Sequence, residues 1–173
     1  MSRQIIFTSL YTAFLLVPLG IIAWITGRPF LFPSVGPSAF LLAMILYGQP
    51  TSARRVIGGH TIGTIAGLLS YHLIASGLVI TNVAPLLAGE QLRLVTSATL
   101  SLILTSAGML YTETVHPPAC ATTLIVSLGF LASFLGGSII IGSVIVLYIV
   151  HFLIIRYVIP APDVSPGEQS VDL

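Results

Sequence analysis

The chain has 173 residues, of which 55% are hydrophobic and only 6% are charged, and its mean hydropathy is +1.06. A water-soluble domain of this size carries charge on about a quarter of its residues, so the solvent for most of this chain must be lipid. A formal net charge of +1 without a clustered basic face argues against a nucleic-acid partner, and a single cysteine, Cys120, excludes an internal disulfide and a cysteine-based metal site. The composition predicts an all-α, multi-pass integral membrane protein.

Four apolar stretches without Asp, Glu, Lys or Arg are long enough to be transmembrane helices. They cover residues 5–26, 56–80, 94–110 and 136–155. A helix rises 1.5 Å per residue, so about 20 residues cross a hydrocarbon core of about 30 Å. The first stretch ends without a small-residue cleavage pattern, so we expect a retained helix there and not a signal peptide.

Two further apolar stretches, residues 29–48 and 112–131, are interrupted by prolines. Proline stops a helix that precedes it but fits the first helical turn. Each stretch therefore predicts an extended segment followed by a short helix, over about 37–47 and 117–130. Extended backbone covers about 3.3 Å per residue, so segment and helix together could cross the bilayer. Protein or a water-filled cavity must then satisfy the interrupted backbone.

The two interrupted stretches also match each other in sequence. Residues 34–39 (SVGPSA) align with residues 114–119 (TVHPPA) at an offset of 80, and Gly58-Gly59 aligns with Gly136-Gly137 at an offset of 78. Membrane sequences drawn from few residue types match easily by chance, but here the match falls on the prolines. The order long helix, broken segment, Gly-Gly, long helix is thus predicted twice, in repeats of about residues 5–80 and 92–158.

The arginines favour six membrane crossings over four. With six, the broken segments cross, and one side carries Arg3, Arg54, Arg55 and Arg156, while Arg28 and Arg93 lie opposite with Glu90. With four, the broken segments re-enter, and the Arg54-Arg55 pair moves to the side opposite Arg3. Six segments form two inverted three-segment repeats, with the second segment of each a broken half-helix.

The predicted organisation is a transmembrane domain over residues 1–159 and a disordered polar tail over residues 160–173, which contains prolines and acidic residues. We expect both termini on the cytoplasmic side of a bacterial inner membrane.

The two short helices suggest where a ligand binds. A helix N-terminus exposes unpaired N–H groups and a partial positive charge, so two that face each other near the membrane midplane would hold an anion. Because proline has no N–H, the expected donors are those of Ser38, Ala39 and Phe40 in the first helix and of Ala119 and Cys120 in the second. Hydroxyl groups, including that of Thr122, add further donors. The predicted substrate-binding residues are Ser34, Gly36, Ser38, Ala39, Thr114, His116, Ala119, Cys120 and Thr123.

His116 is the titratable residue within these motifs, and an ionisable residue inside a membrane segment usually has a function. For His60, His72 and His151 we expect packing or anchoring instead. Neither a metal site nor a cofactor is predicted, because the histidines lack a cysteine or carboxylate cluster at ligand spacing. Glu113 precedes the second motif and could pair with an arginine or with His116.

Other features have structural interpretations. Arg54 and Arg55 follow the first short helix, where a cation complements the helix dipole. Gly59, Gly63 and Gly67 form a small-xxx-small ribbon, which would build either the internal core or a subunit interface.

The segment Val115-His116-Pro117-Pro118-Ala119 resembles the HPP family of integral membrane proteins, and residues 56–60 (VIGGH) look like its second hallmark. The resemblance covers about residues 5–158. This chain differs at Cys120, where the family usually has glycine, and at residues 52–54, Ser-Ala-Arg in place of Gln-Pro-Arg. The resemblance implies transport, with nitrite the substrate associated with plant and cyanobacterial members. The family is customarily described with four membrane spans, which conflicts with the six crossings predicted from the arginines.

The sequence therefore predicts membrane transport of a small inorganic anion, with nitrite the first candidate. The expected partners are that anion and the lipid bilayer, with a homodimer as an open option. Two alternatives remain. One is a membrane-embedded enzyme that uses His116 and Glu113 as acid and base, and the other is a non-transporting assembly subunit.

Overall fold

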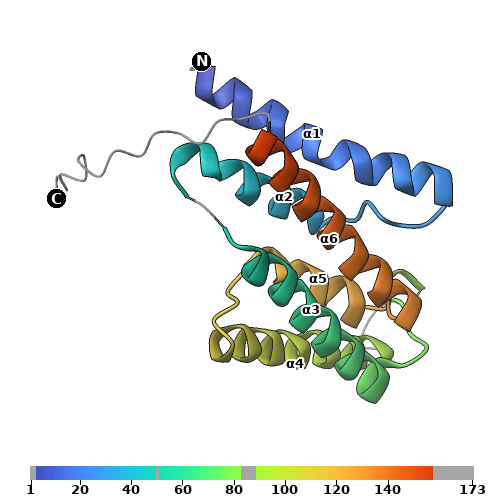
Figure 1. The fold of residues 1–173 in the computed structure, drawn as a ribbon. Helices are drawn as coiled ribbons and strands as arrows, with labels where there is room; N and C mark the ends of the chain where they lie inside the picture. The colour runs from blue at the N-terminus through green and yellow to red at the C-terminus, as the bar shows by residue number, and fades with distance from the viewer. Residues whose placement is uncertain (1–2, 50, 83–88, 158–173) are drawn as a thin grey trace.

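The computed structural model describes residues 3–49, 51–82 and 89–157, and in these all regular secondary structure is helical (Figure 1). Its α-helices are α1 (Arg3–Thr26), α2 (Val35–Ala43), α3 (Ala53–Ser70), α4 (Gly89–Tyr111), α5 (Pro118–Ser127) and α6 (Phe134–Tyr157). A 3-10 turn, Met44–Tyr47, continues α2, and a π turn, Tyr71–Ala75, continues α3.

Four helices of the described part are long and apolar enough to cross a membrane: α1, α3 with its continuation to Asn82, α4 and α6. This confirms the all-α membrane class and the four predicted long spans. The predicted polar tail, residues 160–173, lies outside the described residues.

The two predicted short helices are present with shifted boundaries. α2 begins at Val35, because the first helical turn lacks internal N–H partners and so accepts Pro37 as its third residue. α5 begins at Pro118, the favoured place for proline. The segment before α2, residues 27–34, contains turns and bends. The expectation of continuous extended backbone is therefore wrong there.

Side-chain contacts fix the directions of the long helices. α3 and α4 are antiparallel, since Arg54 Nη2 donates to the Thr112 carbonyl (2.8 Å) at one end and Arg93 Nε donates to the Ile74 carbonyl (2.7 Å) at the other. α1 and α6 are joined by a hydrogen bond between Tyr11 Oη and His151 Nδ1 (2.8 Å), and Figure 1 shows that the two helices run in opposite directions.

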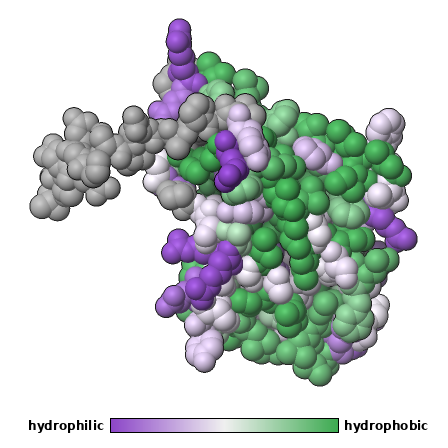
Figure 2. Space-filling model, viewed as in Figure 1, coloured by the Kyte–Doolittle hydropathy of each residue, from purple (hydrophilic) through white to green (hydrophobic). Residues whose placement is uncertain are grey.

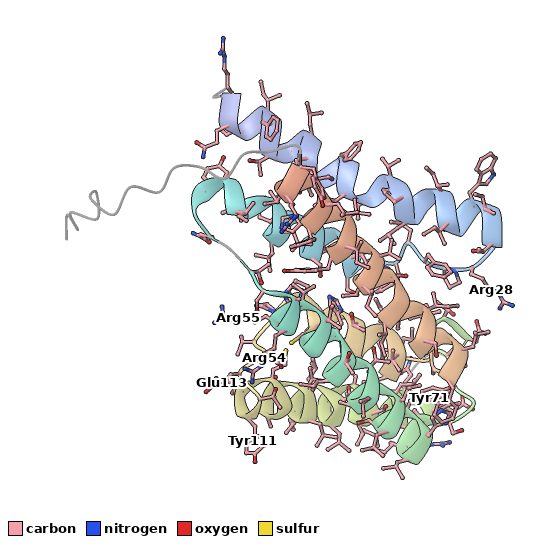
Figure 3. The ribbon with its side chains drawn as sticks, in the orientation of Figure 1. Arg28, Arg54, Arg55, Tyr71, Tyr111 and Glu113 are labelled. Carbon is pink, nitrogen blue, oxygen red and sulfur yellow. The ribbon has the colours of Figure 1, made fainter. Side chains whose placement is uncertain are left out.

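Figure 1 shows that α1 and α3 run in one direction and that α4 and α6 run in the opposite one, with a short helix returning between each pair. In Figure 3, Arg54, Arg55 and Glu113 lie at one end of the assembly, and Arg28 and Tyr71 lie at the other. The chain thus passes long, short, long twice.

The glycine ribbon of α3 packs against α5. A Cβ atom added at Gly63 would lie 2.7 Å from the Ala119 carbonyl oxygen, and one at Gly67 would lie 2.8 Å from Val126 Cβ. Glycine is required here because the two helix backbones approach so closely. Of the two predicted roles, the ribbon thus builds the internal core.

The face of the assembly in Figure 2 is largely apolar, with an extensive green surface. Large exposed hydrophobic side chains come from every long helix and include Phe7, Trp24, Leu73, Ile103 and Phe134. Such a surface is expected where lipid is the solvent.

Candidate functional site

A hydroxyl group lies between two imidazole rings where α2, α3 and α5 meet. Ser38 Oγ of α2 is 2.8 Å from His60 Nε2 of α3 and 3.0 Å from His116 Nε2, just before α5. The two ring centroids are 5.1 Å apart. Ser38 and His60 are 0% exposed and His116 is 1% exposed, so the group is shut off from the surface.

Two further hydroxyl groups close a ring of hydrogen bonds. Ser34 Oγ is 2.6 Å from Thr122 Oγ1, and Thr122 Oγ1 is 2.7 Å from His60 Nδ1. Ser38 Oγ donates to the Ser34 carbonyl (3.1 Å). Ser34 and Thr122 are both fully buried. We call Ser34, Ser38, His60, His116 and Thr122 the polar centre.

Counting donors assigns the protons within the polar centre. Ser38 has one hydroxyl proton and donates it to the Ser34 carbonyl, so both imidazole Nε2 atoms must donate to Ser38 Oγ. His60 Nδ1 then accepts from Thr122, which in turn accepts from Ser34. Every one of these contacts is satisfied when each imidazole carries a single proton on Nε2.

Two glycines of α3 allow the His-Pro-Pro segment to reach Ser38. A Cβ atom at Gly59 would lie 2.8 Å from His116 Cβ, and one at Gly58 would lie 2.9 Å from Thr114 Cγ2. The Gly-Gly-His and His-Pro-Pro motifs, more than fifty residues apart in the sequence, are thus two sides of one site. Pro118, two residues after His116, is the first residue of α5 and ends the loop there.

The structure brings together three of the predicted site residues, Ser34, Ser38 and His116. The other six lie around them and have different surroundings. Thr123 and Ala119 face α3 and α4, Thr114 packs on Gly58, Ala39 belongs to the apolar core, and Gly36 and Cys120 are partly exposed.

The expected backbone donors are wrong in both short helices. The N–H groups of Ala119 and Cys120 donate to the carbonyls of His116 and Pro117 (2.9 and 3.0 Å), because the prolines start a tight turn whose carbonyls accept them. In α2 the earlier start engages Ser38 N–H with the Ser34 carbonyl (3.4 Å), and the two N–H groups that follow it lie inside the helix.

One first-turn donor of α2 remains. Val35 N–H bonds the Phe32 carbonyl (3.1 Å) and Pro37 has none, whereas the Gly36 N–H has no partner among the described residues. Gly36 is therefore the backbone group of this turn that can bond a ligand.

Sequence reasoning missed His60 and left Thr122 out of the predicted set. Both side chains are fully buried members of the polar centre. The Gly-Gly-His pattern was the available signal for His60. It indicates a close helix contact next to a histidine, but it does not show which segment makes that contact.

Charged groups lie away from the polar centre. Glu113 is exposed, has a left-handed backbone (φ 57°), and makes no hydrogen bond or ion pair with His116 within the described part. Arg54 donates to the Thr112 carbonyl just after α4, a contact that does not involve the first short helix, whose dipole it was predicted to complement. Among the described residues no three His, Cys, Asp or Glu side chains are grouped as metal ligands.

The fold and this site define a class of protein: an α-helical, multi-span membrane protein with a buried histidine and hydroxyl centre between two short helices. The family model described as HPP, transmembrane region, matches residues 1–158, and the chain belongs to this family. No curated protein and no solved structure matches it.

Proposed function

We propose that this protein transports a small inorganic anion, with nitrite the first candidate, across the membrane and binds it at the polar centre. The observation that carries the proposal is the convergence of two imidazole Nε2 atoms on the Ser38 hydroxyl, in a fully buried place within an apolar assembly. Buried polar groups inside a membrane protein are costly and commonly mark a substrate pathway.

The donor set suits an anion. Both Nε2–H groups donate to Ser38 Oγ, so an anion that replaces this oxygen as their acceptor receives two N–H donors at once. The Ser38 hydroxyl can then turn its proton from the Ser34 carbonyl to the anion as a third donor. The N-termini of α2 and α5 add partial positive charge. Each hydrogen bond to a charged ligand contributes about 1.5–3 kcal/mol. The carboxylate nearest in sequence, Glu113, is exposed and does not compete for these donors.

We further propose six crossings arranged as two inverted repeats. The helix directions support this, since α1-α2-α3 and α4-α5-α6 run oppositely and each short helix returns between two parallel long ones (Figure 1). The packing supports it too: α3 contacts α4 and α5, while in the other half α6 contacts α1 and α2. Inverted repeats form a substrate site at their interface, and this site can open to one side of the membrane and then to the other.

The sequence left two alternatives, and both lose support. An enzyme with His116 and Glu113 as acid and base needs these groups together, whereas His116 is bound to buried Ser38 and Glu113 is exposed. A non-transporting assembly subunit would use the glycine ribbon for a partner, whereas Gly63 and Gly67 pack against α5 of the same chain.

The test is flux of nitrite, nitrate, formate and chloride into liposomes that contain the purified protein. We expect the parent to conduct at least one of them, with Ser38→Ala reducing its flux about tenfold or more, the loss for one hydrogen bond to a charged ligand. Ser138→Ala is the matched control, because Ser138 is exposed on α6 and bonds only its own helix. A folded parent that conducts none of the four anions overturns the proposal.

A further inference from the structure

Helix α4 buries a row of hydroxyl groups. Ser97, Ser101 and Thr105 are spaced by four residues, so they lie on one face of the helix, and each is 0% exposed. We call these three residues the hydroxyl stripe. Small side chains such as these let membrane helices pack closely, and their hydroxyl groups also give one face of α4 a buried polar surface over three consecutive turns.

The hydroxyl stripe begins beside the polar centre. Thr105 Oγ1 is 2.8 Å from Thr123 Oγ1 of α5, and Thr123 is the residue that follows Thr122 of the polar centre in the chain, on a neighbouring face of the same helix. At its far end Ser97 Oγ donates to the Ser127 carbonyl (3.1 Å), near the end of α5. Ser97 and Thr105 are separated by eight positions in the sequence, which corresponds to about 12 Å of helix.

Two unpartnered hydroxyl groups lie at the far end of this row. Ser127 Oγ and Ser70 Oγ are fully buried and bond no atom of the described residues. Ser127 is held against Ser97 through its carbonyl, and Ser70 continues the face of α3 on which Gly63 and Gly67 meet α5. Buried hydroxyl groups are almost always bonded, so these two have capacity left for a ligand or for water.

An apolar cluster closes the row. Leu94, one turn before Ser97 on α4, is 0% exposed and packs with Tyr71, Ala75 and Ala132. These four residues, which we call the apolar plug, lie toward the end of the assembly where Arg93 bonds the Ile74 carbonyl. The row of hydroxyl groups therefore connects the polar centre with a closed, apolar end.

We propose that the hydroxyl stripe, with Thr123, Ser127 and Ser70, is the route by which the anion passes between the polar centre and the membrane face at which α4 begins, and that the apolar plug is the barrier on this route. A partly dehydrated anion exchanges water for hydroxyl donors along such a path. The inference rests on the proposed transport function, and it adds the direction of the route and its specificity-determining residues.

The test removes hydroxyl groups with little change in the shape of the side chain. Thr105→Val and Ser101→Ala remove a stripe hydroxyl, while Thr99→Val and Ser106→Ala make the same changes at exposed positions of α4. Anion flux into liposomes, equilibrium anion binding and the melting temperature are measured for each. We expect the stripe variants to lose about tenfold in flux, the loss for one hydrogen bond to a charged ligand, while binding and the two control variants stay at parent values.

The outcomes distinguish a failure of the proposed route from a failure of the proposed transport function. Stripe variants that conduct at the parent rate overturn the route and leave the proposed function standing. A parent that conducts no anion overturns both. If Thr105→Val does not fold, Thr105→Ser and Thr105→Ala replace it. The route requires serine to retain flux and alanine to lose it, and equal flux in the two folded variants overturns the route.

Discussion

The two halves of the chain share a framework but not their chemistry. Both contain a long helix, a short helix begun around proline, and a long helix that carries a Gly-Gly pair. In the first half, Gly59 lies against His116 and the next residue, His60, enters the polar centre. In the second half, Gly137 lies against Thr64 and Leu68, and the residue at the position of His60 is Ser138, which is exposed.

The two short helices differ in the same way. α5 is enclosed by α3 and α4 and is lined by buried hydroxyl groups, whereas α2 packs mainly on α1 and α6 through apolar residues and reaches the polar centre with Ser34 and Ser38. The repeated framework thus places the helices of the two halves symmetrically. Their polar side chains are not symmetric, so the two halves contribute differently to the polar centre. Each prediction below tests either the shared framework or the unequal chemistry.

The shared framework predicts which side of the membrane each end of the assembly faces. Arg28 and Arg54 lie at opposite ends of the assembly (Figure 3), so cysteines introduced at positions 28 and 54 should react with a membrane-impermeant thiol reagent from opposite sides, position 54 from the cytoplasm. Oriented vesicles and mass spectrometry measure this, with the parent, which contains Cys120 alone, as the baseline. Reaction of both positions from one side would leave only four crossings and rule out inverted repeats.

The close contact of α3 with α5 predicts a loss of folded protein. Gly63→Val places side-chain atoms within 2.7 Å of the Ala119 carbonyl, and overpacking of this kind costs about 1–3 kcal/mol or more. Gly142→Val is the matched control on α6, since a Cβ there meets nothing within 4 Å. Thermal unfolding in detergent should show a lower midpoint for the first variant only. Equal midpoints would mean that α3 and α5 do not pack as closely as described.

The unequal chemistry predicts that the histidines differ in importance. His60→Ala and His116→Ala each remove one of the two Nε2–H donors at Ser38, so each should reduce anion flux about tenfold to a hundredfold. His72→Ala should leave flux near the parent value, because His72 is exposed and stacks on Phe134. Flux through liposomes, normalised to folded protein, is the measurement. A His60→Ala variant with parent flux would remove α3 from the binding site.

Much of the fold was predictable from the sequence because length and hydropathy alone mark a membrane-spanning helix. The local motifs also predicted Ser34, Ser38 and His116, since the prolines mark where short helices begin. The partners of these residues were not predictable, because His60 and Thr122 join them only through the packing of α3 on α5.

The prediction of free backbone N–H donors in the short helices was wrong for a local reason. The rule that proline exposes the next N–H groups does not count the carbonyls of His116 and Pro117, which accept them in a tight first turn. Patterns of residue type do not contain that geometry.

The smallest predicted effect concerns Cys120, which is half-buried in the first turn of α5, four residues after His116. Its N–H is bonded to the Pro117 carbonyl, so the expected backbone contact with the anion is absent and only proximity remains. A small water-soluble thiol reagent that reaches Cys120 through the pathway should react more slowly when an anion occupies the polar centre. At half-saturating anion the rate should fall by about half, because half of the molecules are occupied.

Labelling rates with and without each transported anion measure this effect, with a non-transported anion at equal ionic strength as the control. A packing thiol that faces lipid would react at one rate under every condition, and free cysteines commonly have such a role. Ready labelling that no transported anion slows would place the bound anion away from the start of α5. That result would shift the binding site toward Ser34, Gly36 and the first turn of α2, and so would sharpen the contrast between the two short helices.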